Sequence, residues 1–357
     1  MDGGWVDSRL IAAQIMAPGR VEIVELPLPE PGPGEVRVRL EGCGVCSSNV
    51  TAWAGLGWSG PDWAGPYGTG WHRTRPDRAD REATGPARTE LTAGFPLPPG
   101  APGREGWGRI DAIGAGVPTT RLDERVAVLT ERGFASHVVV PQDAALDIPP
   151  NLLGQAVPAA PMGLVVSVFR AARIRRRSTV AVVGMGFVGA MLTRLASMAG
   201  ARVIVVASRD ESLELARTMG AAQTVLLAED GTVQEQIAAL TEGAGCDVSI
   251  ECTGQRGPLD LAAAITCESG RLVIAGLPGQ GDTALRTRPD LDIVDPHMRD
   301  RGTTLSAMRE ALLLVTSGVL VPQPLLTHRY PLFRLGDALN ATRDKPDGFV
   351  KAMVVMP

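Results

Sequence analysis

A glycine-rich stretch, V-V-G-M-G-F-V-G, directly follows a short apolar run and opens a helical pattern. Its glycines, Gly184, Gly186 and Gly189, have a spacing in which each has a role: a tight turn, close backbone approach to a diphosphate, and close packing of helix on strand. Phe187 and Val188 complete the loop and are expected to line it. Backbone N–H groups at such a helix N-terminus attract phosphate. The stretch therefore predicts a dinucleotide-binding site.

The residues that end the second strand, ARVIVVAS (201–208), select the dinucleotide. A site for NAD usually offers a carboxylate there to bind the ribose 2′-hydroxyl. This chain has Ala207, Ser208 and Arg209 instead, and a guanidinium with a neighbouring hydroxyl suits a 2′-phosphate. The sequence therefore predicts NADP(H) as the cofactor. The alternative is that Arg209 is a solvated charge at the start of a helix and that the site accepts both cofactors.

Strand-like and helical stretches alternate in the second half of the chain. The strand-like runs are 179–184, 201–208, 247–254 and 271–279. Parallel strands joined by crossover helices form a doubly wound α/β domain, which we expect over 158–318. Thr253 and Gly276 follow two of these runs, and they are expected to flank the cofactor because strand C-termini line the crevice of such sheets.

The first and last parts of the chain have a different pattern. Short β-type runs divided by proline and glycine fill 10–50 and 126–148, and mixed β pattern returns in the last forty residues. We therefore expect one β-rich domain built from 1–157 and 319–357. An insert over about 54–102 is rich in Gly, Pro, Trp and Arg, and is either a lid over the cleft or a surface segment.

The composition narrows the class of protein. Apolar residues make up 45% of the 357 residues and charged ones 21%, which is a globular balance. The net charge of −4 does not indicate a surface that binds nucleic acid. The longest largely apolar run, 156–169, is too short to span a membrane. The five scattered cysteines are typical of reduced thiols. With no signal-peptide pattern at the start, these features predict a cytoplasmic protein that acts on a small molecule.

Several motifs together resemble the medium-chain dehydrogenase/reductases, the zinc alcohol dehydrogenase superfamily. VEIVELPLPEPGPGEVRVRLEGCGVCSSN is similar to that family's GroES-like start, and PGREGWGRIDAIGAGV, DERVAVL and FASHVVVP follow its next conserved run. STVAVVGMGFVG resembles its dinucleotide motif, and the last thirty residues its C-terminal return. The resemblance implies a GroES-like β-rich catalytic domain plus a Rossmann domain, with the cofactor between them. It also implies a homodimer or homotetramer.

The catalytic zinc site of the family is degenerate in this sequence. Cys46 stands where the first ligand is expected, but Arg104 replaces the histidine that precedes the motif glutamate, Glu105. The third ligand should fall in 159–164, AAPMGL, which contains no cysteine, carboxylate or imidazole. A guanidinium stays protonated and cannot ligate a cation. We therefore expect no metal, unless His72 or Asp62 of the insert rebuilds a site with Cys46 and Glu105.

The remaining residues suggest how hydride transfer would proceed without zinc. Ser48 occupies the position of the family's proton-passing hydroxyl, two residues after Cys46. Arg104 can supply the positive charge for a developing oxyanion, with Glu105 expected to hold it by an ion pair; alternatively, Arg104 only fills the vacated metal pocket. By resemblance, Lys351 is a basic residue near the diphosphate.

These observations predict an NADPH-dependent, zinc-independent oxidoreductase that reduces a carbonyl or an activated C=C bond, in a specialised biosynthetic role. Two alternatives are a zinc alcohol dehydrogenase with rebuilt ligands and a non-catalytic NADPH-binding protein. Binding of NADPH without turnover would favour the last of these.

Overall fold

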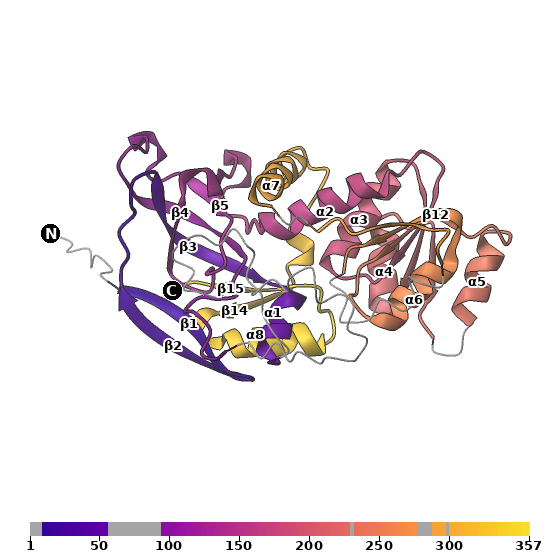
Figure 1. Ribbon diagram of the computed structural model, residues 1–357, viewed down its shortest axis with the longest axis horizontal. Coiled ribbons are helices and arrows are strands. Elements are labelled where there is room, and N and C mark those ends of the chain that lie inside the picture. The colour runs from indigo at the N-terminus through magenta and orange to yellow at the C-terminus, as the bar shows by residue number, and fades with distance from the viewer. Residues whose placement is uncertain (1–8, 56–93, 229–231, 277–287, 298–299) are drawn as a thin grey trace, which may run out of the picture.

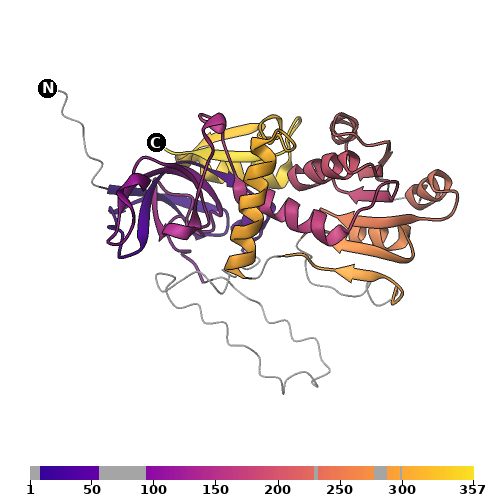
Figure 2. The same cartoon turned by 90° about the horizontal axis from the view of Figure 1, so that it is seen from above.

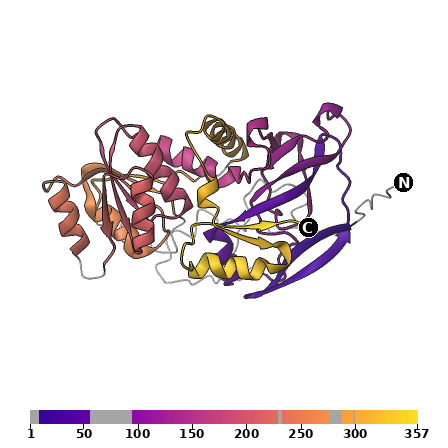
Figure 3. The same ribbon diagram turned by 180° about the vertical axis from the view of Figure 1, so that it is seen from behind.

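The computed structural model describes residues 9–55, 94–228, 232–276, 288–297 and 300–357. Within these ranges the chain forms two large sheets side by side, with the C-terminus returning beside the first (Figures 1 and 3). None of the described helices has the length and apolar character to cross a membrane. The insert expected over 54–102 falls mostly outside the described residues, and so do His72 and Asp62.

A seven-stranded sheet runs in the order β14-β15-β3-β4-β5-β7, and its seventh strand, β6, also pairs with β3. Its strands are β3 (Glu35–Val45), β4 (Glu105–Ile113), β5 (Arg125–Val128), β6 (His137–Pro141), β7 (Ala145–Asp147), β14 (His328–Pro331) and β15 (Ala352–Val355). A hairpin of β1 (Arg9–Ala17) and β2 (Arg20–Pro27) lies beside it, as does helix α1 (Ser47–Trp53). Helix α8 (Leu335–Asp344) packs on α1, and the Trp53 indole donates to Asn340 Oδ1 (3.0 Å).

The second sheet has six strands in the order β10-β9-β8-β11-β12-β13, and all neighbouring pairs are parallel. The strands are β8 (Thr179–Val183), β9 (Arg202–Ala207), β10 (Gln223–Leu226), β11 (Cys246–Glu251), β12 (Thr266–Ile274) and β13 (Asp292–Val294). The helices are α2 (Ala159–Ala172), α3 (Phe187–Met198), α4 (Asp210–Thr218), α5 (Thr232–Leu240), α6 (Arg256–Ile265) and α7 (Arg301–Thr316). This is the doubly wound arrangement predicted from the strand and helix alternation.

Burial explains why these strands read as continuous apolar runs. On β8, Val180 and Val182 pack into one hydrophobic cluster, while Ala181 and Val183 pack into a second cluster on the opposite face. Both faces of the strand are therefore dry, as expected for a parallel sheet covered by helices on both sides. Because side chains alternate along a strand, each run needs apolar residues at every position.

The larger of the two clusters extends beyond the parallel sheet. It contains core residues of the seven-stranded sheet, such as Val38 and Val126, together with buried residues of α2 and α7. Helices α2 and α7 pack against each other, and α7 lies between the two sheets (Figure 2). The exact division into two domains that the sequence predicted stays a prediction, because one core connects the two sheets.

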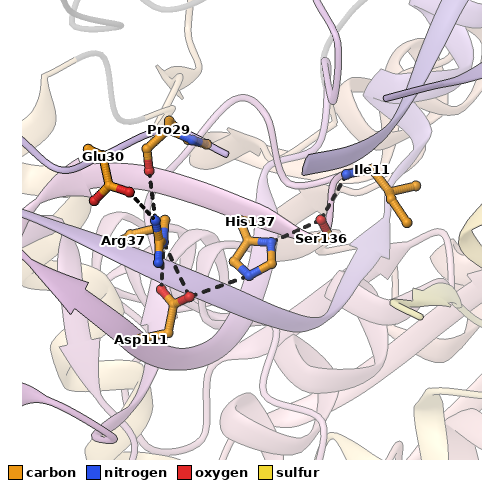
Figure 4. Close-up of polar contacts among 7 residues, drawn as sticks. All are labelled: Ile11, Pro29, Glu30, Arg37, Asp111, Ser136 and His137. Atoms are coloured by element: carbon orange, nitrogen blue, oxygen red, sulfur yellow. Dashed lines mark hydrogen bonds and ion pairs between the residues drawn. The ribbon is translucent and has the colours of Figure 1, made fainter. Parts of the chain in front are cut away.

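Around His137, a polar network ties the first hairpin to the large sheet (Figure 4). His137 is 4% exposed and lies 3.4 Å from Asp111 through Nε2, while its Nδ1 lies 3.0 Å from Ser136 Oγ. Ser136 Oγ in turn accepts from the Ile11 N–H (3.0 Å), and Arg37 donates to Asp111. Burial raises the pKa of Asp111, but hydrogen bonds from His137 and Arg37 outweigh this and lower it. The contacts give His137 a structural role.

Candidate active site

The glycine loop after β8 has the geometry that a dinucleotide requires. Gly184 has φ +99°, which favours glycine, and a Cβ on Gly189 would overlap the Gly184 carbonyl oxygen. Gly186 caps the N-terminus of α3, is exposed, and has open space where its Cβ would be. Phe187 is buried at the first turn of the helix and Val188 is half-buried. The loop therefore presents the open N-terminus of α3 as a cradle for a diphosphate.

Two other strand ends lie beside this loop. Thr253 follows β11, and a Cβ on Gly184 would meet its Cγ2 at 2.5 Å. Gly276 follows β12. It lies so close to Gly254 that a side chain on Gly276 would overlap the Gly254 backbone. The residues that the sequence predicted to flank the cofactor thus stand at the C-terminal edge of the sheet, next to the glycine loop.

Glu251 organises this edge, and the sequence analysis did not single it out. Its carboxylate is 1% exposed and accepts from the Thr253 N–H (2.5 Å) and the Gly254 N–H (3.1 Å). Burial raises the pKa of Glu251, while the hydrogen bonds from Thr253 and Gly254 oppose that rise. A carboxylate as the last residue of a largely buried strand, in DVSIECTG, was the signal available in the sequence.

At the end of β9, Ser208 is exposed and Arg209 precedes α4. The Arg209 guanidinium reaches across to the segment between α8 and β15, where Nη1 donates to the Lys345 carbonyl (3.0 Å) and Nη2 to the Phe349 carbonyl (3.0 Å). Two nitrogens of the Arg209 guanidinium are therefore engaged with backbone carbonyls of this segment, and the role of Arg209 toward a 2′-phosphate stays a prediction.

Cys46 and Ser48 lie where β3 passes into α1. Cys46 is the N-cap of the helix, and its Sγ lies 2.6 Å from Ser48 Oγ. Asn49 fixes this turn, because its Oδ1 accepts from the Cys46 N–H (2.8 Å) and its Nδ2 donates to the Pro102 carbonyl (2.8 Å). The thiol and the hydroxyl thus form one hydrogen-bonded pair on a rigid support.

The expected ion pair between Arg104 and Glu105 is wrong, because the two side chains have different partners. Arg104 Nε donates to Glu131 Oε2 (2.7 Å), and Glu131 is buried behind it, with its side chain 8% exposed. Adjacent side chains of an extended chain point to opposite faces, so the side chains of Arg104 and Glu105 point away from each other and do not pair. Burial raises the pKa of Glu131 to about 7, although the charge and hydrogen bond of Arg104 act to lower it.

Glu105 pairs with Lys351 in the interior. The Lys351 ammonium lies 2.7 Å from Glu105 Oε2, donates to the Val45 carbonyl (3.2 Å), and sits 5.0 Å from the centre of the Phe187 ring. Both charged side chains are 5% exposed or less. Lys351 therefore lies next to Phe187 of the glycine loop with its charge engaged by Glu105, and its predicted place near a diphosphate stays a prediction.

Strand register brings Arg104 to the same end of the sheet as Cys46. Gly44 of β3 pairs with Glu105 of β4 in an antiparallel arrangement. Cys46, which follows Gly44, and Arg104, which precedes Glu105, therefore lie at the same end of these two strands. The stretch 159–164 begins α2, where Met162 is fully buried. Nowhere in the described ranges do three His, Cys, Asp or Glu side chains gather as a metal would require.

Comparisons with known proteins agree with this architecture. A family model described as zinc-binding dehydrogenase matches residues 188–312. The chain is 24% identical over 366 residues to a sorbitol dehydrogenase of Gallus gallus, covering 93% of each chain. It is 30% identical over 191 residues to an NADP-dependent isopropanol dehydrogenase of Thermoanaerobacter brockii, covering 52% of this chain and 54% of that one. The chain is thus similar to zinc-type dehydrogenases along most of its length, in agreement with the resemblance to the medium-chain dehydrogenase/reductases.

Solved structures support the fold. A protein described as a zinc-binding dehydrogenase of Sinorhizobium meliloti, bound to NADP, superimposes with a TM-score of 0.73 at 22% identity, covering 98% of this chain and 99% of that one. The predicted fold class, a GroES-like β-rich part plus a doubly wound Rossmann part, is confirmed. The roles of the individual site residues stay predictions.

Proposed function

We propose that this protein is an NADPH-dependent oxidoreductase that delivers hydride to a carbonyl or an activated C=C bond of a small molecule without a catalytic zinc ion. One observation carries the proposal: beside an intact dinucleotide cradle, an arginine held by Glu131 occupies the position of the family's metal-binding histidine. The cradle supports hydride chemistry, and the arginine supports a different means of stabilising charge.

The described residues fit a nicotinamide dinucleotide. The open N-terminus of α3 would hold the diphosphate, with Gly186 leaving room for its approach. Ser208 and Arg209 would bind the 2′-phosphate, and Thr253 and Gly276 would flank the cofactor at the strand ends. When bound, the cofactor supplies the hydride. The NADP-dependent dehydrogenase of T. brockii and the NADP-bound structure from S. meliloti favour this assignment.

The same residues do not fit a catalytic zinc ion. Such a site needs three protein ligands, and Cys46 alone retains a suitable donor at the family positions. Arg104 is permanently cationic, and Glu105 is engaged by Lys351. A dication next to this guanidinium would be repelled.

Charge and proton transfer would instead come from two side-chain pairs. Arg104 offers a cation to the oxygen that becomes negative, and the buried Glu131 keeps that cation in one orientation. Cys46 and Ser48 share a hydrogen bond of 2.6 Å. When the thiol donates to Ser48 Oγ, the Ser48 proton is free to be donated to the substrate oxygen.

The test combines metal analysis with labelled cofactor. The purified protein is assayed for bound zinc, and NADPH carrying deuterium at C4 is supplied with carbonyl and enone substrates. We expect less than about 0.1 zinc per chain and deuterium on the carbonyl carbon or the β-carbon of the enone, which separates the two reactions. Stoichiometric zinc would overturn the zinc-free mechanism. NADPH binding without any turnover would favour a non-catalytic protein.

Variants at Arg104 test its role directly. R104Q removes the charge and is expected to lower kcat about a hundredfold while the Kd for NADPH stays unchanged. R104K keeps the charge and is the matched control, with a smaller loss. Equal activity of R104Q and wild type would reduce Arg104 to a filler of the former metal pocket.

The proposal extends to the cellular compartment, the domain limits and the oligomeric state of the enzyme. All five cysteines are free thiols, which suits a reducing compartment such as the cytoplasm. Domain limits at 157/158 and 318/319, and assembly as a homodimer or homotetramer, are proposed from the resemblance to the superfamily. Gel filtration with light scattering measures the assembly.

A further inference from the structure

In the ion pair between Arg104 and Glu131, the cation is the more accessible partner. The Arg104 side chain is 30% exposed, whereas that of Glu131 is 8% exposed. Arg104 Nε donates to Glu131 Oε2 (2.7 Å), so the carboxylate is the buried anchor of the guanidinium. Solvent therefore reaches the positive side chain more readily than the negative one. A dissolved anion that approaches this edge of the sheet meets a cation able to form charge-assisted hydrogen bonds.

A buried amide joins the segment of Arg104 to the turn that carries the Cys46–Ser48 pair. Asn49 is 1% exposed, its Oδ1 accepts from the Cys46 N–H (2.8 Å), and its Nδ2 donates to the Pro102 carbonyl (2.8 Å). Pro102 precedes Arg104 by two residues. The accessible cation and the hydroxyl proposed to donate a proton are thus tied to one support.

The charge at this edge suits a monoanion. The Glu105–Lys351 pair adds no net charge, and both of its side chains are 5% exposed or less. Burial raises the pKa of Glu131 to about 7, so near neutral pH a part of the protein has Glu131 protonated and the Arg104 charge less compensated. The pair of Arg104 and Glu131 therefore carries between zero and one positive charge. A carboxylate matches this charge better than a phosphate monoester, which carries close to two negative charges.

We propose that the substrate is a 2-oxo carboxylate and that Arg104 binds its carboxylate together with the neighbouring carbonyl oxygen. The inference rests on the proposed reduction by NADPH and names the substrate class of that same site. A guanidinium is planar and presents its N–H donors as a fork, which matches two oxygens on adjacent carbons. The oxygen that becomes negative is then already held by the cation that stabilises it.

The reaction balances as the reduction of a carbonyl group. Hydride from C4 of NADPH forms the new C–H bond at the carbonyl carbon, and the π electrons of the C=O bond move to its oxygen. That oxygen takes the Ser48 proton, which the Cys46 thiol and then solvent replace. The products are a 2-hydroxy carboxylate and NADP⁺. An enoate is a poorer acceptor, because its negative carboxylate opposes hydride addition to the conjugated C=C bond.

Arg104 could instead only fill the former metal pocket and contact the buried Glu131. That role predicts no preference between a 2-oxo acid and its neutral ester. The proposed role predicts a preference for the acid that depends on the residue at position 104. A pair of substrates that differ only in this charge therefore separates the two roles.

Phenylglyoxylate and methyl phenylglyoxylate form such a pair, because they share the same ring and the same reducible carbonyl. The ester is intrinsically the more reactive ketone, so a preference for the acid reports recognition of the carboxylate. At pH 8 we expect kcat/KM of wild type to be at least about tenfold higher for the acid. In R104Q the ratio of acid to ester should fall about tenfold or more, and R104K should keep part of it. The ratio cancels any effect of Arg104 that both substrates share.

R109Q is the matched control for loss of a partly exposed arginine. Arg109 lies on β4, its side chain is 32% exposed, and it pairs with Glu41 and Asp123. The two arginines are thus similar in exposure and both are paired with carboxylates. R109Q should leave the ratio of acid to ester unchanged.

E131Q tests the same charge balance from the other side. At pH 8 a carboxyl group with a pKa of about 7 is mostly ionised, and E131Q removes that negative charge. We expect kcat/KM for the acid to rise about threefold and that for the ester to change less than about twofold. A purely structural role of Glu131 would change both substrates alike.

Binding to the complex with NADP⁺ needs no turnover. NADP⁺ has no hydride to give, so calorimetry measures the Kd of each unreacted ketone. We expect wild type to bind phenylglyoxylate at least about tenfold more tightly than the methyl ester, and R104Q to bind the two with similar Kd values.

The outcomes distinguish this inference from the function on which it depends. Reduction of other carbonyl or enone substrates without a preference for acid over ester, or with a preference that R104Q leaves unchanged, overturns the inference alone. Acid-selective binding that requires Arg104, without hydride transfer to any carbonyl or enone, supports the carboxylate site and overturns the proposed reduction. A protein that binds neither NADPH nor NADP⁺ overturns both.

Discussion

Replacing Glu131 by glutamine should flatten the pH dependence of stability. Glu131 has a pKa of about 7 in the folded protein, against an ordinary value of 4.5, because burial disfavours its charged form. Each tenfold change in proton affinity is worth about 1.4 kcal/mol, so this rise amounts to about 3 kcal/mol. The folded state holds the proton more tightly than the unfolded state does. The stabilisation is therefore complete below about pH 4.5 and is lost as the pH rises through 7.

Urea unfolding of wild type and E131Q at pH 5, 6, 7 and 8 measures this effect. E131Q has no proton to lose at this position, and its amide oxygen can still accept from Arg104. The free energy of unfolding of wild type, relative to that of E131Q, should fall by about 2.5 kcal/mol between pH 5 and 8. E214Q, at a carboxylate that is 73% exposed and paired with Arg217, is the control for loss of a surface charge. Parallel stability curves for wild type and E131Q would refute the assignment of a retained proton to Glu131.

Three further predictions concern the cofactor, the metal and the buried ion pair. G189A places a methyl group on the Gly184 carbonyl and should weaken NADPH binding roughly tenfold to a hundredfold by calorimetry; unchanged affinity would contradict the cradle. Prolonged treatment with 1,10-phenanthroline should leave turnover unchanged, whereas inhibition reversed by added zinc would point to a metal on Cys46. K351M leaves Glu105 buried without its partner and should lower the free energy of unfolding by about 3 kcal/mol. The double variant K351M/E105Q should recover part of that loss, and failure to do so would mean that the pair is not the cause.

The nucleotide half was accessible to sequence reasoning because its signals are local. The loop around Gly184 carries its requirement for glycine within six residues, and each buried strand repeats an apolar pattern over a short window. Such patterns reflect backbone conformation and burial, which neighbouring residues impose on each other. Ser208 and Arg209 could be singled out for the same reason, since they directly follow the strand β9, and their role in binding the cofactor stays a prediction.

The partners of the charged residues were not accessible, because they come from distant parts of the chain. Glu131 reaches Arg104 through a bridge between Gly103 and Arg132, a tertiary pairing that no local pattern encodes. Lys351 meets Glu105 across 246 residues. The sequence placed Arg104 next to Glu105, but strand geometry turns neighbouring side chains apart, and the nearest charge in sequence was the wrong partner.

The hydrophobic cluster shared by both sheets has a consequence for how the molecule can be dissected. One hydrophobic cluster contains residues from both halves of the chain, including Val38, Val126, Met162, Val180 and Met308. A fragment restricted to 158–318 would therefore expose apolar side chains of α2 and α7 to solvent. We expect such a fragment to aggregate, and calorimetry of the intact chain to give a single melting peak in which both halves are lost together. Rotation of one sheet against the other would then require the buried side chains that the two halves share to repack.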